Sequence, residues 1–66
     1  MNWSNVIMRL RKKLLLTQSE FAELINVSFA AVNRWENGHN EPTIKMKRNI
    51  KKLCIKNGIE FDSEML

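Results

Sequence analysis

The chain must hold its fold together without a covalent or metal cross-link. It has 66 residues, and small domains of this length often need a disulfide or a bound metal because their apolar core is small. Cys54 is the only cysteine and His39 the only histidine, so neither an internal disulfide nor a zinc site can form. We therefore expect no metal and no other cofactor, and a fold built from closely packed helices in one domain over residues 1–66.

Apolar residues recur at the spacing of amphipathic helices. The first series predicts a helix over residues 4–14, with Arg9, Lys12 and Lys13 pointing outward; its apolar members are Trp3, Val6, Ile7, Leu10 and Leu14. Tyrosine is absent and runs of β-branched residues are short, so strands are poorly supported.

Start and stop signals predict three more helices. Thr17 to Glu20 form a capping box, and the helix that it opens ends at Asn26. The inner face of this helix is expected to consist of Phe21, Leu24 and Ile25, with the small Ala22.

Ser28 caps the third helix, which Gly38 ends, and Thr43 caps a fourth helix over 44–57, which Gly58 ends. The residues of the fourth helix that are expected to face the core are Met46, Ile50, Leu53 and Cys54. The tail 59–66 suits a strand, a short helix or a frayed end. The expected fold class is thus all-α, a compact bundle of four short helices with room for a fifth.

Residues 18–37 have the spacing of a helix-turn-helix unit. Ala22 is small where two short helices would cross, and Asn26 tolerates the positive backbone angle that a tight turn requires. The shared interior would be filled by Phe21, Ile25, Val27, Val32 and Trp35. Such a unit projects its second helix at the fixed angle that the major groove of DNA requires.

The cap residues and the apolar spacing together resemble the Cro/C1-type (XRE-like) helix-turn-helix family over roughly residues 5–57. The segments that carry the resemblance are LTQSEFAELI (16–25), VS (27–28), NRWENG (33–38) and EPT (41–43), preceded by the basic run RLRKK (9–13). The resemblance implies a lambda-repressor-like fold and sequence-specific binding of double-stranded DNA, with helix 28–37 in the major groove. It also implies a transcriptional regulator of bacterial or phage type, a repressor in preference to an activator.

Two positions depart from the family pattern. Many members have glycine where this chain has Leu15, so this loop is expected to be strained or the helix slightly longer. Members usually have glycine at Asn26 as well, and asparagine is the mildest replacement there.

The resemblance also assigns candidate site residues. The candidate base readers are Phe29, Ala30, Asn33 and Arg34. The candidate phosphate contacts are Gln18, Ser28, Asn37, His39 and Asn40. Arg11 and Glu36 are expected to form a structural ion pair, and Lys45 and Lys47 to add longer-range attraction.

Each of these assignments has a structural alternative. Phe29 could belong to the core if its helix were rotated, and Arg34 could pair with Glu23 or Glu36. Asn33 and His39 could have no special role. The lysines of the fourth helix could form only a solvated face.

Charge is unevenly distributed along the chain. Residues 1–16 carry +4, residues 17–44 carry −3, residues 45–56 carry +6 and residues 57–66 carry −3. The helix-turn-helix itself is therefore acidic, and nonspecific attraction to phosphate must come from the flanking helices.

One such domain buries little surface, so we expect a homodimer on two half-sites about 34 Å apart. Residues 50–66 are expected to form its contact, through Ile55, Ile59, Phe61 and Met65. The competing interpretation is a protein-interaction module, either an antitoxin-like subunit or the targeting domain of a longer protein.

Other classes are disfavoured. No nucleophile–base pair and no metal-ligand set is apparent, so an enzyme and a small-molecule ligand are not expected. No apolar run approaches the roughly 20 residues of a membrane span. The N-terminus also lacks the pattern of a secretory signal, so the expected compartment is the cytoplasm.

Overall fold

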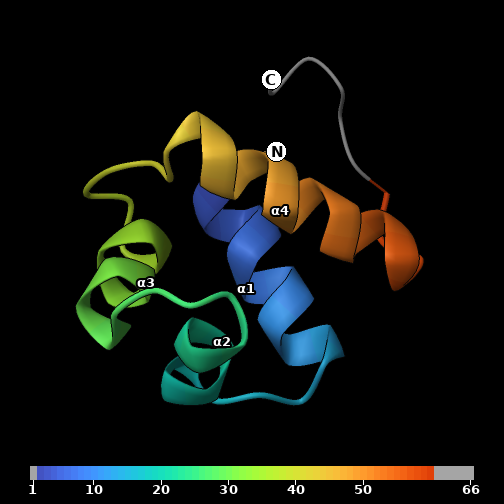
Figure 1. Ribbon diagram of the computed structural model, residues 1–66, viewed down its shortest axis with the longest axis horizontal. Helices are drawn as coiled ribbons and strands as arrows, with labels where there is room; N and C mark the ends of the chain where they lie inside the picture. The colour runs from blue at the N-terminus through green and yellow to red at the C-terminus, as the bar shows by residue number, and fades with distance from the viewer. Residues whose placement is uncertain (1, 61–66) are drawn as a thin grey trace.

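The structure is a computed structural model that describes residues 2–60. In this range it contains four α-helices and no strand. The helices are α1 (Trp3–Lys13), α2 (Gln18–Leu24), α3 (Phe29–Glu36) and α4 (Ile44–Lys56). α1 packs against both α3 and α4, and α2 packs against α3, which lies at one end of the molecule (Figure 1). The predicted all-α fold is confirmed, and the tail 61–66 lies outside the described residues.

All three predicted helix caps are present. The hydroxyl oxygens of Thr17 and Ser28 each accept a hydrogen bond from the backbone N–H three residues further on, both at 3.1 Å, and that of Thr43 does so at 3.4 Å. The Glu20 carboxylate accepts the Thr17 N–H at 2.9 Å, which completes the capping box. α1 begins at Trp3 after an Asn2 cap that was not predicted from the sequence.

Every helix ends in the same way. The residue one place beyond the C-cap has a positive φ: Leu15 (58°), Asn26 (61°), Gly38 (74°) and Gly58 (73°). The backbone N–H of the residue that follows then donates a hydrogen bond to the carbonyl five residues earlier. Leu16 donates to Arg11 in this way, and Ile59 to Cys54. These are Schellman motifs, which reverse the chain within two residues. The expected left-handed turn at Asn26 and the strain at Leu15 are both present.

The core lies where the four helices meet. Its fully or nearly fully buried apolar residues are Trp3, Val6, Ile7, Leu10, Phe21, Ala22, Ile25, Val32, Trp35, Ile50, Cys54 and Ile59. Partly buried side chains pack around them, including Val27, Met46 and Leu53. Most of these positions follow the predicted helical spacing.

Two predicted orientations are wrong. Leu24 was expected on the inner face of α2, but its side chain is 53% exposed because Phe21 and Ile25 already fill that face. Ile59 was expected on the surface, but it is only 8% exposed. The Schellman turn at Gly58 directs Ile59 back toward Cys54 and so into the core.

Candidate nucleic-acid interface

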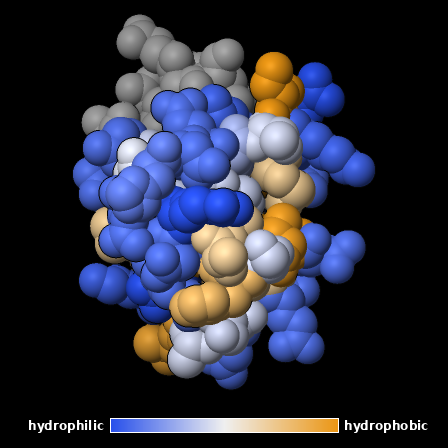
Figure 2. Space-filling model, turned by 90° about the vertical axis from the view of Figure 1, so that its left-hand side faces the viewer, coloured by the Kyte–Doolittle hydropathy of each residue, from blue (hydrophilic) through white to orange (hydrophobic). Residues whose placement is uncertain are grey.

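The outer surface of α3 is free of packing contacts with the core. Val32 and Trp35 point inward and are buried, whereas Phe29, Ala30 and Arg34 are exposed. Phe29 is 51% exposed, so its alternative placement in the core is wrong. Figure 2 views the side of the molecule on which α3 lies and shows a band of apolar residues that crosses a largely hydrophilic surface.

The guanidinium of Arg34 makes no ion pair within residues 2–60. In particular, neither Glu23 nor Glu36 binds it, so the intramolecular alternative for Arg34 is not observed. Its five N–H donors are therefore available for a ligand.

An ion pair fastens α3 to α1. Arg11 Nε donates to Glu36 Oε2 at 2.7 Å and Arg11 Nη2 donates to Glu36 Oε1 at 3.0 Å, a two-pronged pair. Arg11 Nη1 also donates to the carbonyl of Leu16 at 3.1 Å. The hydrogen bond to Glu36 raises the pKa of the Arg11 guanidinium. The expected structural pair is thus present, and it fixes the end of α3 against α1.

Gln18 connects the same ion pair to the outer surface of α3. Its Nε2 donates to Glu36 Oε1 at 3.1 Å, and its Oε1 accepts from Asn33 Nδ2 at 3.2 Å. Asn33 Oδ1 in turn accepts from Asn37 Nδ2 at 3.2 Å. A continuous chain of hydrogen bonds therefore runs from Arg11 to the C-terminal end of α3. These links were not predicted from the sequence, although polar residues at the start of α2 and within α3 were a signal for them.

This chain of hydrogen bonds leaves binding capacity on Asn33. An asparagine side chain has two N–H donors and two acceptor lone pairs, and the chain uses one of each. One donor and one lone pair remain, which is the set that a two-pronged contact with adenine requires. Asn33 is half-buried and held in place, so the alternative of an idle surface residue does not describe it.

The candidate phosphate contacts surround α3. Ser28 lies at its N-terminus, and Asn37, His39 and Asn40 follow its C-terminus; all four are exposed. In the Schellman turn after α3, the backbone N–H of His39 donates to the carbonyl of Arg34 at 3.0 Å. This hydrogen bond fixes the start of the loop. Gln18 is half-buried and retains one amide hydrogen beyond its bond to Glu36.

Lys47 differs from its expected role. Its Nζ lies 2.8 Å from Glu41 Oε1 and 5.3 Å from the centre of the Trp3 ring. Its charge is thus largely matched within the protein. Lys45 is exposed and has no ion-pair partner within residues 2–60.

Residues 7–62 match the family model described as Helix-turn-helix. The chain belongs to the Cro/C1-type helix-turn-helix family. No curated protein and no solved structure matches the chain. Members of this family are DNA-binding transcriptional regulators, and the family is not typically enzymatic. The exposed outer surface of α3 is therefore the candidate DNA interface of this helix-turn-helix protein.

The described residues provide neither a candidate metal site nor a candidate membrane-spanning helix. Among residues 2–60, no group of three or more His, Cys, Asp or Glu side chains is placed to hold a metal ion. Within the same range, no helix has the length and apolar character needed to cross a membrane.

Proposed function

We propose that this helix-turn-helix protein recognises a specific sequence in double-stranded DNA and represses transcription there. The observation that carries the proposal is the combination of an exposed outer surface on α3 with the hydrogen-bonded chain that fixes α3 against α1 and α2. A recognition helix can discriminate between bases only if its angle in the major groove is fixed.

The proposed reading mechanism assigns a part to each candidate base reader of α3. Arg34 donates two hydrogen bonds to a guanine, and Asn33 makes the two-pronged contact with an adenine. Phe29 and Ala30 pack against thymine methyl groups. Phosphates on either side are held by Gln18, Ser28, Asn37, His39 and Asn40, which set the register without reading sequence.

Selection of binding sites from a random duplex library tests this proposal. Enrichment of one sequence, arranged as an inverted repeat, is the expected result. Recovery of random duplexes would contradict sequence-specific binding, and recovery of a stoichiometric protein partner in place of DNA would favour the interaction module.

Substitution of Arg34 tests the base contact. Arg34→Ala should weaken binding to the selected site by about 1–3 kcal/mol and relax the preference at one base position. The matched control is Arg9→Ala, which removes an exposed arginine from α1 and should leave the preference unchanged. Equal weakening of Arg34→Ala on every sequence would show that Arg34 contacts only phosphate.

Substitution of Gln18 tests the positioning of Asn33. Gln18→Ala should weaken binding to all sequences, because it removes a phosphate contact. It should also soften the preference at the base read by Asn33, because Asn33 loses the acceptor that holds it. A weakening without any change in the preference at that base would show that the hydrogen bond from Asn33 to Gln18 does not position Asn33.

We further propose a homodimer through residues 50–66 that places two α3 helices about 34 Å apart. Ile55 supports this surface because it is 62% exposed, whereas the burial of Ile59 removes that residue from it. Phe61 and Met65 lie outside the described residues. Analytical ultracentrifugation with and without DNA tests the dimer, and a monomer at every concentration in both conditions would refute it.

A further inference from the structure

A groove lies between the C-terminal end of α2 and the middle of α4. Leu24, Ile25 and Asn26 line one side, and Asn49, Lys52 and Leu53 line the other, around a volume of about 330 Å³. None of these residues belongs to α3 or to the candidate DNA contacts. The groove is therefore distinct from the candidate DNA interface.

The groove has an apolar interior. Leu24, the last residue of α2, is 53% exposed, whereas Phe21 and Ala22 of the same helix are buried. Leu53 is half-buried, and Ile25 is a buried core residue that also lines the groove. The exposed Leu24 and the half-buried Leu53 line the same groove, so they can offer apolar contacts to a partner helix.

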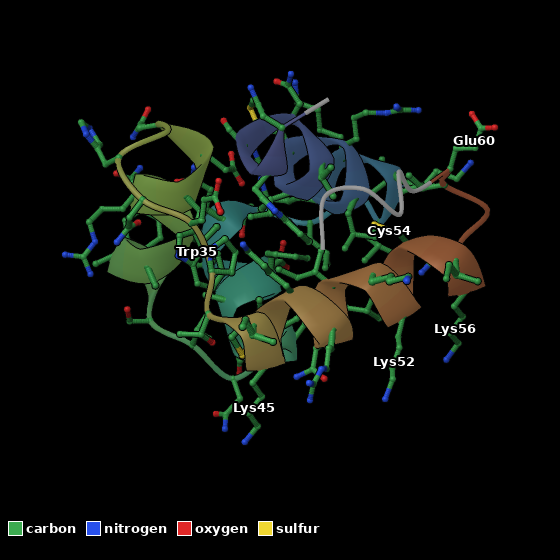
Figure 3. All side chains as sticks on the ribbon, turned by 90° about the horizontal axis from the view of Figure 1, so that it is seen from above. Trp35, Lys45, Lys52, Cys54, Lys56 and Glu60 are labelled. Carbon is green, nitrogen blue, oxygen red and sulfur yellow. The ribbon has the colours of Figure 1, made fainter. Side chains whose placement is uncertain are left out.

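The α4 side of the groove is basic. Lys45, Lys52 and Lys56 extend from the same side of α4, away from α1 (Figure 3). All three are exposed, and none has an acidic ion-pair partner within residues 2–60. No acidic residue occurs in α4. On the α2 side, Glu20 is committed to its capping box with Thr17, and Glu23 is exposed.

We propose that this groove binds an acidic amphipathic helix of a partner protein. Apolar side chains at i, i+4 and i+7 of that helix would contact Leu24 and Leu53, and its carboxylates would face Lys52 and Lys56. Charge complementarity supports this occupant, because one flank of an apolar groove carries only positive charge. Nucleic acid fits less well, since phosphates gain nothing from the leucine-lined interior.

The groove shares Lys52 and Leu53 with the range 50–66 of the proposed dimer contact, but not Ile55, the exposed apolar residue on which that contact depends. Leu53 and Ile55 are two residues apart on α4, which places them roughly 160° apart around the helix axis. A partner in the groove would therefore leave Ile55 free for the second copy.

Selection from a display library of random helical peptides, with the intact protein as target, tests the proposal. The enriched peptides should combine spaced apolar residues with net negative charge. A labelled enriched peptide then serves as the probe. On binding, it should shift the amide resonances of Leu24, Lys52 and Leu53 in ¹⁵N spectra.

Variants test the two parts of the contact. Leu24→Gln, and separately the pair Lys52→Gln and Lys56→Gln, should each weaken the peptide by about tenfold or more. The matched controls are Leu15→Gln, at an exposed leucine outside the groove, and the pair Lys12→Gln and Lys13→Gln on α1. These controls should bind the peptide as the parent does. Lys52 and Lys56 are on the surface, so the double lysine variant still tests the proposal if Leu24→Gln fails to fold.

Three results would overturn the proposal. The first is enrichment of peptides without acidic residues, or no enrichment at all. The second is a probe that shifts α3 in place of the groove. The third is competition between the probe and duplex DNA, or an equal loss of peptide and DNA binding in the lysine variant. Arg34→Ala separates the two functions, because it should lose DNA preference and keep full peptide binding.

Discussion

At the scale of single residues, Leu15 carries a backbone conformation that its side chain disfavours. Its φ is 58°, where an L-residue other than glycine is destabilised by about 1–2 kcal/mol. Its side chain is 90% exposed, so little packing would be lost by replacing it.

Leu15→Gly should stabilise the protein by roughly 1 kcal/mol, because the relief of backbone strain exceeds the greater chain entropy of glycine in the unfolded state. The urea midpoint measures this gain. Leu15→Ala keeps the strain and should give no gain. Asn26→Gly should give a smaller gain, because asparagine tolerates the same conformation. A gain for alanine equal to that for glycine would exclude backbone strain as the cause.

The Arg11–Glu36 pair is expected to matter for stability because the carboxylate of Glu36 is buried. The Glu36 side chain is only 5% exposed, and that of Arg11 is 18% exposed. Arg11→Met should therefore cost roughly 3 kcal/mol of unfolding free energy, since it leaves a buried carboxylate unpaired.

A denaturation series measures this cost, with Glu41→Ala as the control. Glu41 pairs with Lys47 but its side chain is 64% exposed, so its loss should cost about 1 kcal/mol or less. The double variant Arg11→Met with Glu36→Met should recover part of the loss, because no buried charge remains. A double variant less stable than Arg11→Met would contradict this interpretation.

At the scale of elements, the capping box sets the start of α2. Thr17→Ala should cost about 1 kcal/mol, because the backbone N–H of Glu20 loses its acceptor. Circular dichroism during urea unfolding measures the change. Ser19→Ala, at an exposed neighbour outside the box, should have a much smaller effect.

The capping box also predicts a pH dependence. Hydrogen bonds from the backbone N–H and the hydroxyl of Thr17 lower the pKa of Glu20. A lowered pKa means that the folded state favours the ionised carboxylate, so this stabilisation is complete at neutral pH. It is lost as the pH falls below the usual glutamate value of about 4.3 and through the lowered value. Glu20→Gln should reduce the acid sensitivity of the urea midpoint, and an unchanged acid profile would contradict the assignment.

At the scale of the whole molecule, Cys54 reports on cooperative unfolding. Its side chain is fully buried in the core, and burial raises the pKa of its thiol. The reactive species is the thiolate, so Cys54 should be inert toward a chromogenic thiol reagent in the folded protein.

Labelling should then follow the population of unfolded chains. Leu15→Gly should slow the labelling of Cys54, because it stabilises the folded state. Arg11→Met should accelerate the labelling, because it destabilises the folded state. Labelling of the parent protein in urea gives the rate of the free thiol. If the folded protein were labelled at the same rate as the protein in urea, the reagent would reach Cys54 without unfolding of the protein.

The accuracy of the sequence predictions varied with the range of the interactions. Caps at Thr17, Ser28 and Thr43, and the left-handed turn at Asn26, were all predicted correctly. The outward orientation of Leu24 and the inward orientation of Ile59 were not, because several helical orientations satisfy the same apolar spacing. The hydrogen bonds of Gln18 were missed, since they depend on the crossing of α2, α3 and α1.

By itself, the sequence determined where α2, α3 and α4 begin and where the turns at Asn26, Gly38 and Gly58 end a helix, because caps and Schellman turns involve atoms only a few residues apart. It also determined the family, because those local signals occur in one order along the chain. Only the tertiary structure decided which partner each polar side chain takes. Glu36 joins α1, α2 and α3, and Lys47 turns to Glu41 and Trp3. The physical reason is that these contacts depend on the angles at which helices cross, and core packing sets those angles.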